Sequence, residues 1–145
     1  MPINQNQIIM NTLIINKNDY AKIFQCISSA KQDGSIKASE AEQLSKELKS
    51  AKLVDPQNVP ADVITMNSVV KFHFANTKTQ TEIKLVYPSQ ANIKEKKISI
   101  FSAVAIALIG YKVGDEIDWQ LPSGSTKIVI DQIVYQPEAQ GDYDA

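Results

Sequence analysis

Few side chains in this sequence have the type and spacing that catalysis or metal binding needs. The chain contains one histidine, His73, and one cysteine, Cys26. A histidine that binds a metal or transfers a proton needs partner groups, and no second histidine is present to complete such a site. His73 stands between Phe72 and Phe74 on the polar face of a predicted strand. We therefore expect a surface histidine.

Cys26 lies beside the apolar stripe of a predicted helix and has no partner for nucleophilic chemistry. We expect it to be a small buried or half-buried hydrophobic residue. A single cysteine also excludes an internal disulfide, which agrees with a reducing cytoplasm.

Two further groups of residues have a functional and a structural interpretation. Asp33 lies in the turn Asp33-Gly34-Ser35, where the short side chain of an aspartate commonly stabilises the bend. From the residues alone, a solvated turn residue is the favoured interpretation. The larger aromatic side chains could line a pocket, but in a small β domain they more often form the core. They are Phe72, Tyr87, Trp119 and Tyr135.

Composition and charge narrow the classes of partner. All 15 basic residues are lysine and the net charge is -1, so the chain lacks both the arginine fork and the positive field typical of nucleic-acid binding. We expect no sequence-specific nucleic-acid binding. The longest apolar stretch, residues 98–111, is shorter than the ~20 residues of a membrane helix, and residues 1–7 carry no basic region of a secretory signal. We therefore expect no membrane association.

The spacing of apolar residues predicts a helical hairpin in the first part of the chain. Tyr20, Ile23 and Ile27 lie on one face of a helix that should begin near Asn18 or Asp19. Asp33-Gly34-Ser35 ends it. Ser39 and Glu42 have the spacing of a capping box for a second helix, and the apolar positions of that helix have coiled-coil spacing. The short loop makes the two helices antiparallel neighbours.

Beyond Pro60 the apolar period changes from helix to strand. Alternating residues predict strands around 70–74 and 82–87, and a closing hairpin from 116–120 and 126–135. One helix is expected from Ser102 to Ile109, capped by Gly110. The fold class is thus α+β, an antiparallel two-helix hairpin followed by a small antiparallel β domain with one helix.

The same patterns set the expected domain boundaries. We expect an N-terminal segment with the hairpin over residues 1–54, a β domain over 55–138, and an acidic tail over 139–145. Asp55, Pro56 and Pro60 mark the first boundary because proline cannot continue a helix. Residues 136–145 offer little apolar surface to bury, so a frayed tail is predicted there.

Four strings that follow Pro60 resemble a known family. In their types and order they are similar to the C-terminal domain of the bacterial GreA/GreB transcript-cleavage factors. The resemblance implies a β domain of FKBP-like fold that docks on core RNA polymerase, with a hairpin that points into the secondary channel of the enzyme. We expect a cytoplasmic monomer that needs no cofactor. The strings are Thr65-Met66-Asn67-Ser68, Leu85-Val86-Tyr87-Pro88, Ala107-Leu108-Ile109-Gly110 with Gly114-Asp115, and Tyr135-Gln136-Pro137-Glu138-Ala139.

The resemblance also directs attention to the hairpin tip. In Gre factors paired carboxylates at the tip help to hold a second metal ion in the polymerase active site. Their pattern is an aspartate followed three residues later by a glutamate. Here Asp33 is followed by Ile36, and Glu40 and Glu42 already belong to the second helix. That helix has about 14 residues and reaches only ~21 Å. The sequence therefore predicts a hairpin that does not support cleavage.

A second motif of the family belongs to the docking surface. Gre factors carry a serine-proline pair eight residues before the glycine that ends the domain helix, and here that position is Ser102 followed by Ala103. The resemblance implies polymerase contacts at Ser102, Ala103 and Val104, together with Asp33 at the tip.

Two alternative functions stay open on the sequence. The first is a Gre factor that does stimulate transcript cleavage. The second is an FKBP-like peptidyl-prolyl isomerase, although fold alone does not carry function and no string here matches the active-site motifs of such enzymes.

Overall fold

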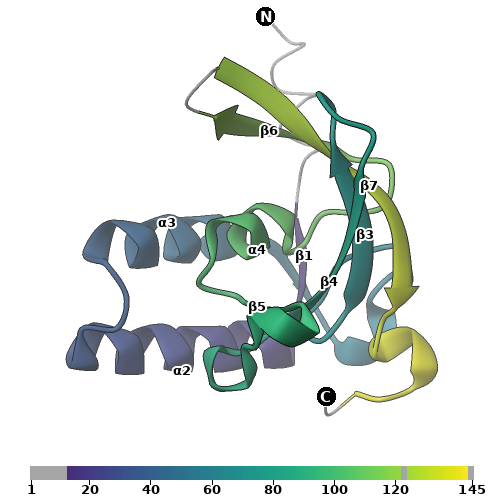
Figure 1. Ribbon diagram of the computed structural model, residues 1–145. Helices are drawn as coiled ribbons and strands as arrows, with labels where there is room; N and C mark the ends of the chain where they lie inside the picture. Colours follow the sequence, from purple (N-terminus) through teal and green to yellow (C-terminus); the bar gives the residue numbers. More distant parts are fainter. Residues whose placement is uncertain (1–12, 122–123, 144–145) are drawn as a thin grey trace, which may run out of the picture.

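The structure is a computed structural model that describes residues 13–121 and 124–143. The first part of the predicted N-terminal segment, the two residues in the middle of the predicted closing loop and the last two residues of the predicted tail lie outside the described residues. The chain forms two N-terminal helices followed by a mixed sheet with a short helix, an α+β arrangement (Figure 1).

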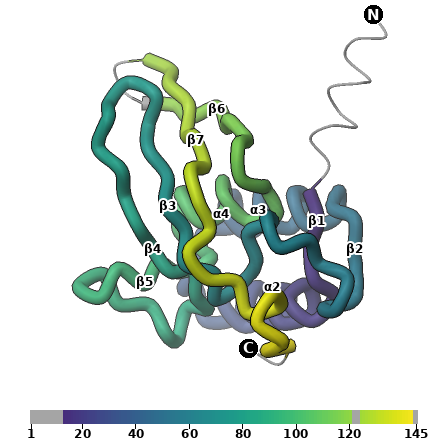
Figure 2. The backbone as a smooth tube through the Cα atoms, turned by 90° about the vertical axis from the view of Figure 1, so that its right-hand side faces the viewer, coloured from purple at the N-terminus to yellow at the C-terminus, as the bar shows by residue number. Residues whose placement is uncertain are grey.

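The helical hairpin is closed at its base by a small parallel sheet. Strand β1 (Ile14–Asn16) leads into α2 (Lys17–Asp33), and α3 (Ala38–Lys49) returns to β2 (Lys52–Val54), and Figure 2 shows β1 and β2 side by side. β1 and β2 pair in parallel. The two helices bury their apolar stripes, whose main residues are at most 3% exposed. These are Ile23, Ile27 and Ala30 from α2, and Ala41, Leu44 and Leu48 from α3.

The predicted ends of the helices were correct only in part. α2 begins at Lys17, earlier than predicted, because the side chain of Asn16 accepts a hydrogen bond of 2.8 Å from the amide of Asn18. The predicted capping box is wrong. α3 begins at Ala38, and its cap residue makes no side-chain hydrogen bond. Instead, the buried residues Ile36 and Ala41 occupy the positions of a hydrophobic staple, which fixes where the chain enters the helix.

The second part of the chain is a five-stranded sheet of order β5-β4-β3-β7-β6. The pairs β3–β4, β3–β7 and β6–β7 are antiparallel, whereas β4–β5 is parallel. The prediction of a purely antiparallel domain was therefore wrong at this edge, where two 3-10 turns, Pro88–Gln90 and Ile93–Glu95, connect β4 to β5. The strands are β3 (Val69–Phe74), β4 (Gln80–Val86), β5 (Lys97–Ser99), β6 (Glu116–Leu121) and β7 (Gly124–Tyr135).

The helices all cover one face of this sheet. The two views agree that α2, α3 and the short helix α4 (Ala103–Leu108) lie on the same side of the strands (Figures 1 and 2). β7 shifts its register against β3 at two places, and such irregularities increase the local twist and bend of a strand. The sheet thus curves around the apolar side chains of α4, among them Ile106 and Leu108, which are buried in the core.

The predicted frayed tail was wrong for its first residues. Gln136 and Glu138 are only 2% and 8% exposed, and a 3-10 turn (Glu138–Gln140) follows β7. Their side chains find buried hydrogen-bond partners, a possibility that apolar content alone does not reveal. Within residues 13–121 and 124–143, no helix is long and apolar enough to cross a membrane.

Candidate functional site

The hairpin tip presents one exposed carboxylate. Gly34 adopts a left-handed conformation at φ 76°, which ends α2, and Asp33 Oδ1 accepts a hydrogen bond of 2.8 Å from the amide of Ser35. The hydrogen bonds from Ser35 lower the pKa of Asp33 below its ordinary value. Asp33 thus stabilises the turn, as the residues alone favoured, and stays ionised at neutral pH.

The tip does not bring a second acid to Asp33. The position three residues later is Ile36, which is 8% exposed and belongs to the core. Among the described residues, no group of three metal-ligating side chains gathers. One carboxylate gives a metal ion fewer oxygen ligands than such an ion takes from a protein site of its own.

The predicted docking residues form the first turn of α4. Ser102 Oγ accepts a hydrogen bond of 3.2 Å from the amide of Ala105, so the serine caps the helix. Ala103 is exposed and Val104 is half-buried. The missing proline does not prevent the helix from starting, because the serine cap supplies the start signal.

Asp33 and the chain just before α4 line one open cavity of about 510 Å³ beside α2. Asp33 stands on its hairpin side, and Phe101 and Pro88 stand on its sheet side. The structure thus brings the tip acid and the start of α4 to the same side of the molecule. Cys26 also lines this cavity and is half-buried, and burial raises the pKa of its thiol. That favours the structural interpretation of the cysteine.

A buried polar network at the base of the hairpin was not predicted. Glu138 accepts hydrogen bonds of 2.7 Å from Asn16 Nδ2 and from Thr65 Oγ1. The hydroxyl groups of Thr65 and Ser68 lie 2.9 Å apart. All four residues are at most 8% exposed. The network therefore ties the start of α2 to the segment before β3 and to the end of β7.

Asp19 extends this network into the first turn of α2. Its carboxylate accepts a hydrogen bond of 3.1 Å from the amide of Met66, and the hydroxyl of Tyr87 lies 3.4 Å away. Burial raises the pKa of Asp19 to about 7. The amide of Met66 opposes this rise, the nearby Glu138 adds to it, and Lys22 and Tyr87 oppose it. A carboxyl group that changes charge near neutral pH thus sits at the junction of the hairpin and the sheet.

Gly110 completes the contact with the hairpin base, and Gln136 holds the segment before β3. Gly110 has φ +85°, and a Cβ atom added there would lie 2.9 Å from the Cβ of Leu13 and 3.1 Å from Ile15 Cδ1. Only glycine fits so close to the strand without strain. Gln136 Nε2 donates to the carbonyl oxygens of Pro60 and Val63 at 2.8 and 2.6 Å. Both residues belong to the strings on which the family resemblance rests.

The four strings therefore converge on one structural task, the junction between hairpin and sheet. Met66, Tyr87, Gly110 and Glu138 each come from a different string, and each contacts the segment from Leu13 to Asp19. The residues in the strings were visible in the sequence. Their common role was not visible there, because it depends on contacts between residues that lie as many as 122 positions apart in the sequence.

The remaining chemical candidates have structural roles. His73 Nδ1 lies 2.9 Å from both carboxylate oxygens of Asp131 on the neighbouring strand β7, which confirms its place on a polar, half-exposed face. Phe72 is 3% exposed and belongs to the core, as predicted. Trp119 and Tyr87 are only partly buried, and Trp119 lines a cleft.

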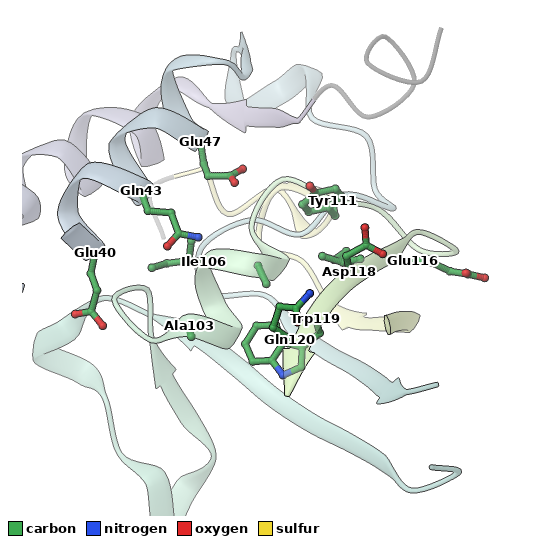
Figure 3. Close-up of a pocket in the computed structure, with 12 residues that line it drawn as sticks. Glu40, Gln43, Glu47, Ala103, Ile106, Tyr111, Glu116, Asp118, Trp119 and Gln120 are labelled. Carbon is green, nitrogen blue, oxygen red and sulfur yellow. The ribbon is translucent and has the colours of Figure 1, made fainter. Parts of the chain in front are cut away.

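That cleft separates α3 from α4 and β6 and encloses about 470 Å³ (Figure 3). Its floor includes Ile106 and Trp119. Glu40 and Glu47 line it from α3, whereas Glu116 and Asp118 line it from β6. Tyr111 also faces the cleft. Burial raises the pKa of Tyr111, and the negative charges of Glu47, Asp115 and Asp118 raise it further.

The chain thus consists of a helical hairpin anchored on a curved mixed sheet, an arrangement that known proteins share. The profile of the family described as "Transcription elongation factor, GreA/GreB, C-term" matches residues 59–135, and the chain belongs to this family.

Two curated relatives extend the similarity. The chain is 40% identical over 104 residues to the regulator of nucleoside diphosphate kinase of Escherichia coli K12, which covers 71% of this chain and 76% of the relative. It is 31% identical over 110 residues to the transcription elongation factor GreA of Syntrophus aciditrophicus, covering 76% of this chain and 68% of the relative.

A solved structure supports the fold. The prokaryotic transcription elongation factor GreA/GreB from Nitrosomonas europaea superposes with a TM-score of 0.70 at 31% identity, and the match covers 86% of this chain and 100% of that structure. The two-helix start and the mixed sheet with a short helix therefore form a GreA-like fold.

Proposed function

We propose that this protein is a cytoplasmic regulator that binds core RNA polymerase at the secondary channel and does not catalyse a reaction itself. Family membership supports polymerase as the partner. The similarity to the regulator of nucleoside diphosphate kinase supports a regulatory role within the family. The observation that carries the absence of cleavage is the tip, where Asp33 is the single acid and is engaged in the turn.

The length of the hairpin supports the same proposal. α2 has 17 residues and α3 has 12, which corresponds to about 26 and 18 Å at about 1.5 Å per residue. An arm of this length enters a channel mouth and ends before a distant active site. Because the base of the arm is held by buried hydrogen bonds, its direction is fixed relative to the docking domain.

The proposed docking surface is the first turn of α4. Ala103 is exposed there, whereas Ser102 is engaged as a helix cap and Val104 is half-buried. We further propose that the sheet and α4 have the FKBP-like arrangement implied by the resemblance, that the hairpin packs as a short coiled coil, and that one monomer binds one polymerase.

Co-purification with core RNA polymerase tests the proposal. We expect retention of the protein at micromolar concentration, with a mass that corresponds to one chain for each polymerase. No retention at that concentration would overturn the proposed partner. Ala103→Asp should weaken retention because it places a charge on the exposed docking turn, whereas Ala91→Asp, on an exposed loop after β4, is the matched control.

The absence of cleavage has its own test. Purified protein is added to backtracked elongation complexes, and the length of the transcript is followed. We expect no shortening. Shortening that disappears in the Asp33→Ala variant would show that the protein is a cleavage-stimulating factor after all.

A further inference from the structure

The cleft between α3 and β6 combines an apolar floor with an acidic rim (Figure 3). Glu40 and Glu47 lie seven residues apart on one face of α3, so both point to the same side of the helix. In the described part of the chain, Glu40, Glu47 and Glu116 take part in no ion pair, whereas Asp118 is paired with Lys127 at 2.8 Å. Glu40 and Glu47 are therefore carboxylates without an ion-pair partner among the described residues, whereas Glu116 lies near Lys127, whose pKa is raised by its hydrogen bond to Asp118 and by the charges of Asp118 and Glu116.

Burial raises the pKa of Tyr111, and the negative charges of Glu47, Asp115 and Asp118 raise it further, so acidic groups lie near this wall of the cleft. Phosphate groups are repelled from such a site, which excludes nucleic acid as its occupant. A lysine or arginine side chain is attracted to the rim, and its cation can also lie against the ring of Trp119.

The position of the cleft indicates which protein supplies that cation. Ala103, in the first turn of α4, lines the cleft and also belongs to the proposed docking surface. A partner that contacts this turn thus reaches the mouth of the cleft. Because one wall comes from the hairpin and the other from the sheet, an occupant contacts both parts of the molecule.

We propose that the cleft between α3 and β6 binds a lysine- or arginine-bearing segment of RNA polymerase. This inference rests on the proposed function and deepens it, since it adds an electrostatic site to the docking turn of α4. The cation lies beside Glu40 and Glu47 of α3, against the ring of Trp119.

The single tryptophan of the chain provides a direct readout, because Trp119 lies in the cleft. Tetralysine serves as the probe and is titrated into the full chain while the tryptophan emission is recorded. We expect a saturable change that weakens as salt is added, since salt screens exposed charges. An emission that does not change, or that changes without saturation, would overturn the proposal.

A pair of charge reversals tests the site on polymerase. The variant Glu40→Lys with Glu47→Lys should lose the response to tetralysine and bind polymerase at least about tenfold more weakly. The control, Glu42→Lys with Asp62→Lys, makes the same change in net charge at exposed positions outside the cleft and should bind like the parent. Reduced binding by both variants alike would overturn the cleft as the site.

A lysine in the first turn of a helix is unfavourable, so the reversed variant can lose part of α3. The variant Glu40→Gln with Glu47→Gln keeps the shape of both side chains and should still lose most of the tetralysine response. If the parent binds polymerase and both cleft variants bind equally well, the cleft proposal fails and the proposed function stands. If the parent itself does not bind polymerase, the proposed function fails, and the cleft as a polymerase site fails with it.

Discussion

The base of the hairpin and its tip differ in the burial of their polar residues and in the partners to which these residues bond. At the base, Asn16 and Asp19 are at most 3% exposed and bond to groups from the sheet domain. At the tip, Asp33 is exposed and accepts a hydrogen bond from Ser35 of its own turn. The strings that identify the family lie at the base, whereas the pattern that would support cleavage is missing from the tip. The residues that identify the family thus fix how the hairpin attaches to the sheet domain. They do not determine the chemistry at the hairpin tip.

The largest expected effect comes from the close approach at the base. Gly110→Val adds a side chain at a positive φ and against the Cβ of Leu13, so strain and overpacking together should lower the free energy of unfolding by about 4 kcal/mol. Urea unfolding followed by circular dichroism measures this. Gly114→Val is the matched control, because its φ is +94° and nothing lies within 4 Å. Equal losses in the two variants would contradict the close contact.

The hydrogen-bond network at the base should give the next largest effect. Glu138→Ala leaves the buried groups of Asn16 and Thr65 without their acceptor and should lower the free energy of unfolding by about 2 kcal/mol. The measurement is the urea midpoint. Glu42→Ala, which removes an exposed carboxylate, serves as the control and should change little. A variant at position 138 as stable as the control would mean that the base is not held by this network.

The pH dependence of stability sharpens the comparison further. In the unfolded chain Asp19 ionises near pH 3.8, and in the folded protein near pH 7. The folded state binds more protons between these values, so stability is fully present below the lower pKa and is lost as pH rises toward the higher one. The loss between about pH 5 and pH 7 should be on the order of 2 kcal/mol.

The Asp19→Asn variant isolates this contribution. The amide that replaces the carboxyl group can still accept from Met66 and does not ionise, so the slope of stability against pH should be smaller than in the parent. Urea midpoints of both proteins at several pH values provide the comparison. Identical slopes would mean that Asp19 does not titrate in this range and that the junction carries no neutral-pH transition.

The smallest effect is expected at the tip. Asp33→Ala removes one exposed side chain and one local hydrogen bond, so the urea midpoint should not change measurably. Affinity for polymerase should fall only by about twofold to threefold, as is typical for a charge at the edge of an interface. A fall in affinity of about tenfold or more would mean that the tip, too, is a principal part of the binding surface.

Local patterns in the sequence were sufficient to predict much of the fold. The apolar spacing of residues 20–30 and the alternation around Phe72 gave the hairpin and the central strands, because each pattern records a face that must be buried. The parallel edge strand β5 was missed since three residues carry little periodic signal. The capping box failed because burial of Ile36 fixed the start of α3 earlier than Ser39.

The candidate site was less accessible from sequence. The tip and the first turn of α4 were located through the family resemblance, and their role as contacts stays a prediction. Asp19 and Glu138 were missed because charged residues are normally assigned to the surface, and only the folded chain brings their partners to them. The acidic cleft was missed for a similar reason, since its walls come from α3 and β6, which lie far apart in the chain.

The most direct test of the account follows transcript length in backtracked elongation complexes that contain a fixed amount of a Gre factor and increasing amounts of this protein. If its hairpin binds at the secondary channel without supporting cleavage, this protein should displace the Gre factor. Transcript shortening should then decline toward the level seen without any factor. Shortening that stays constant, or that increases as this protein is added, would contradict the account.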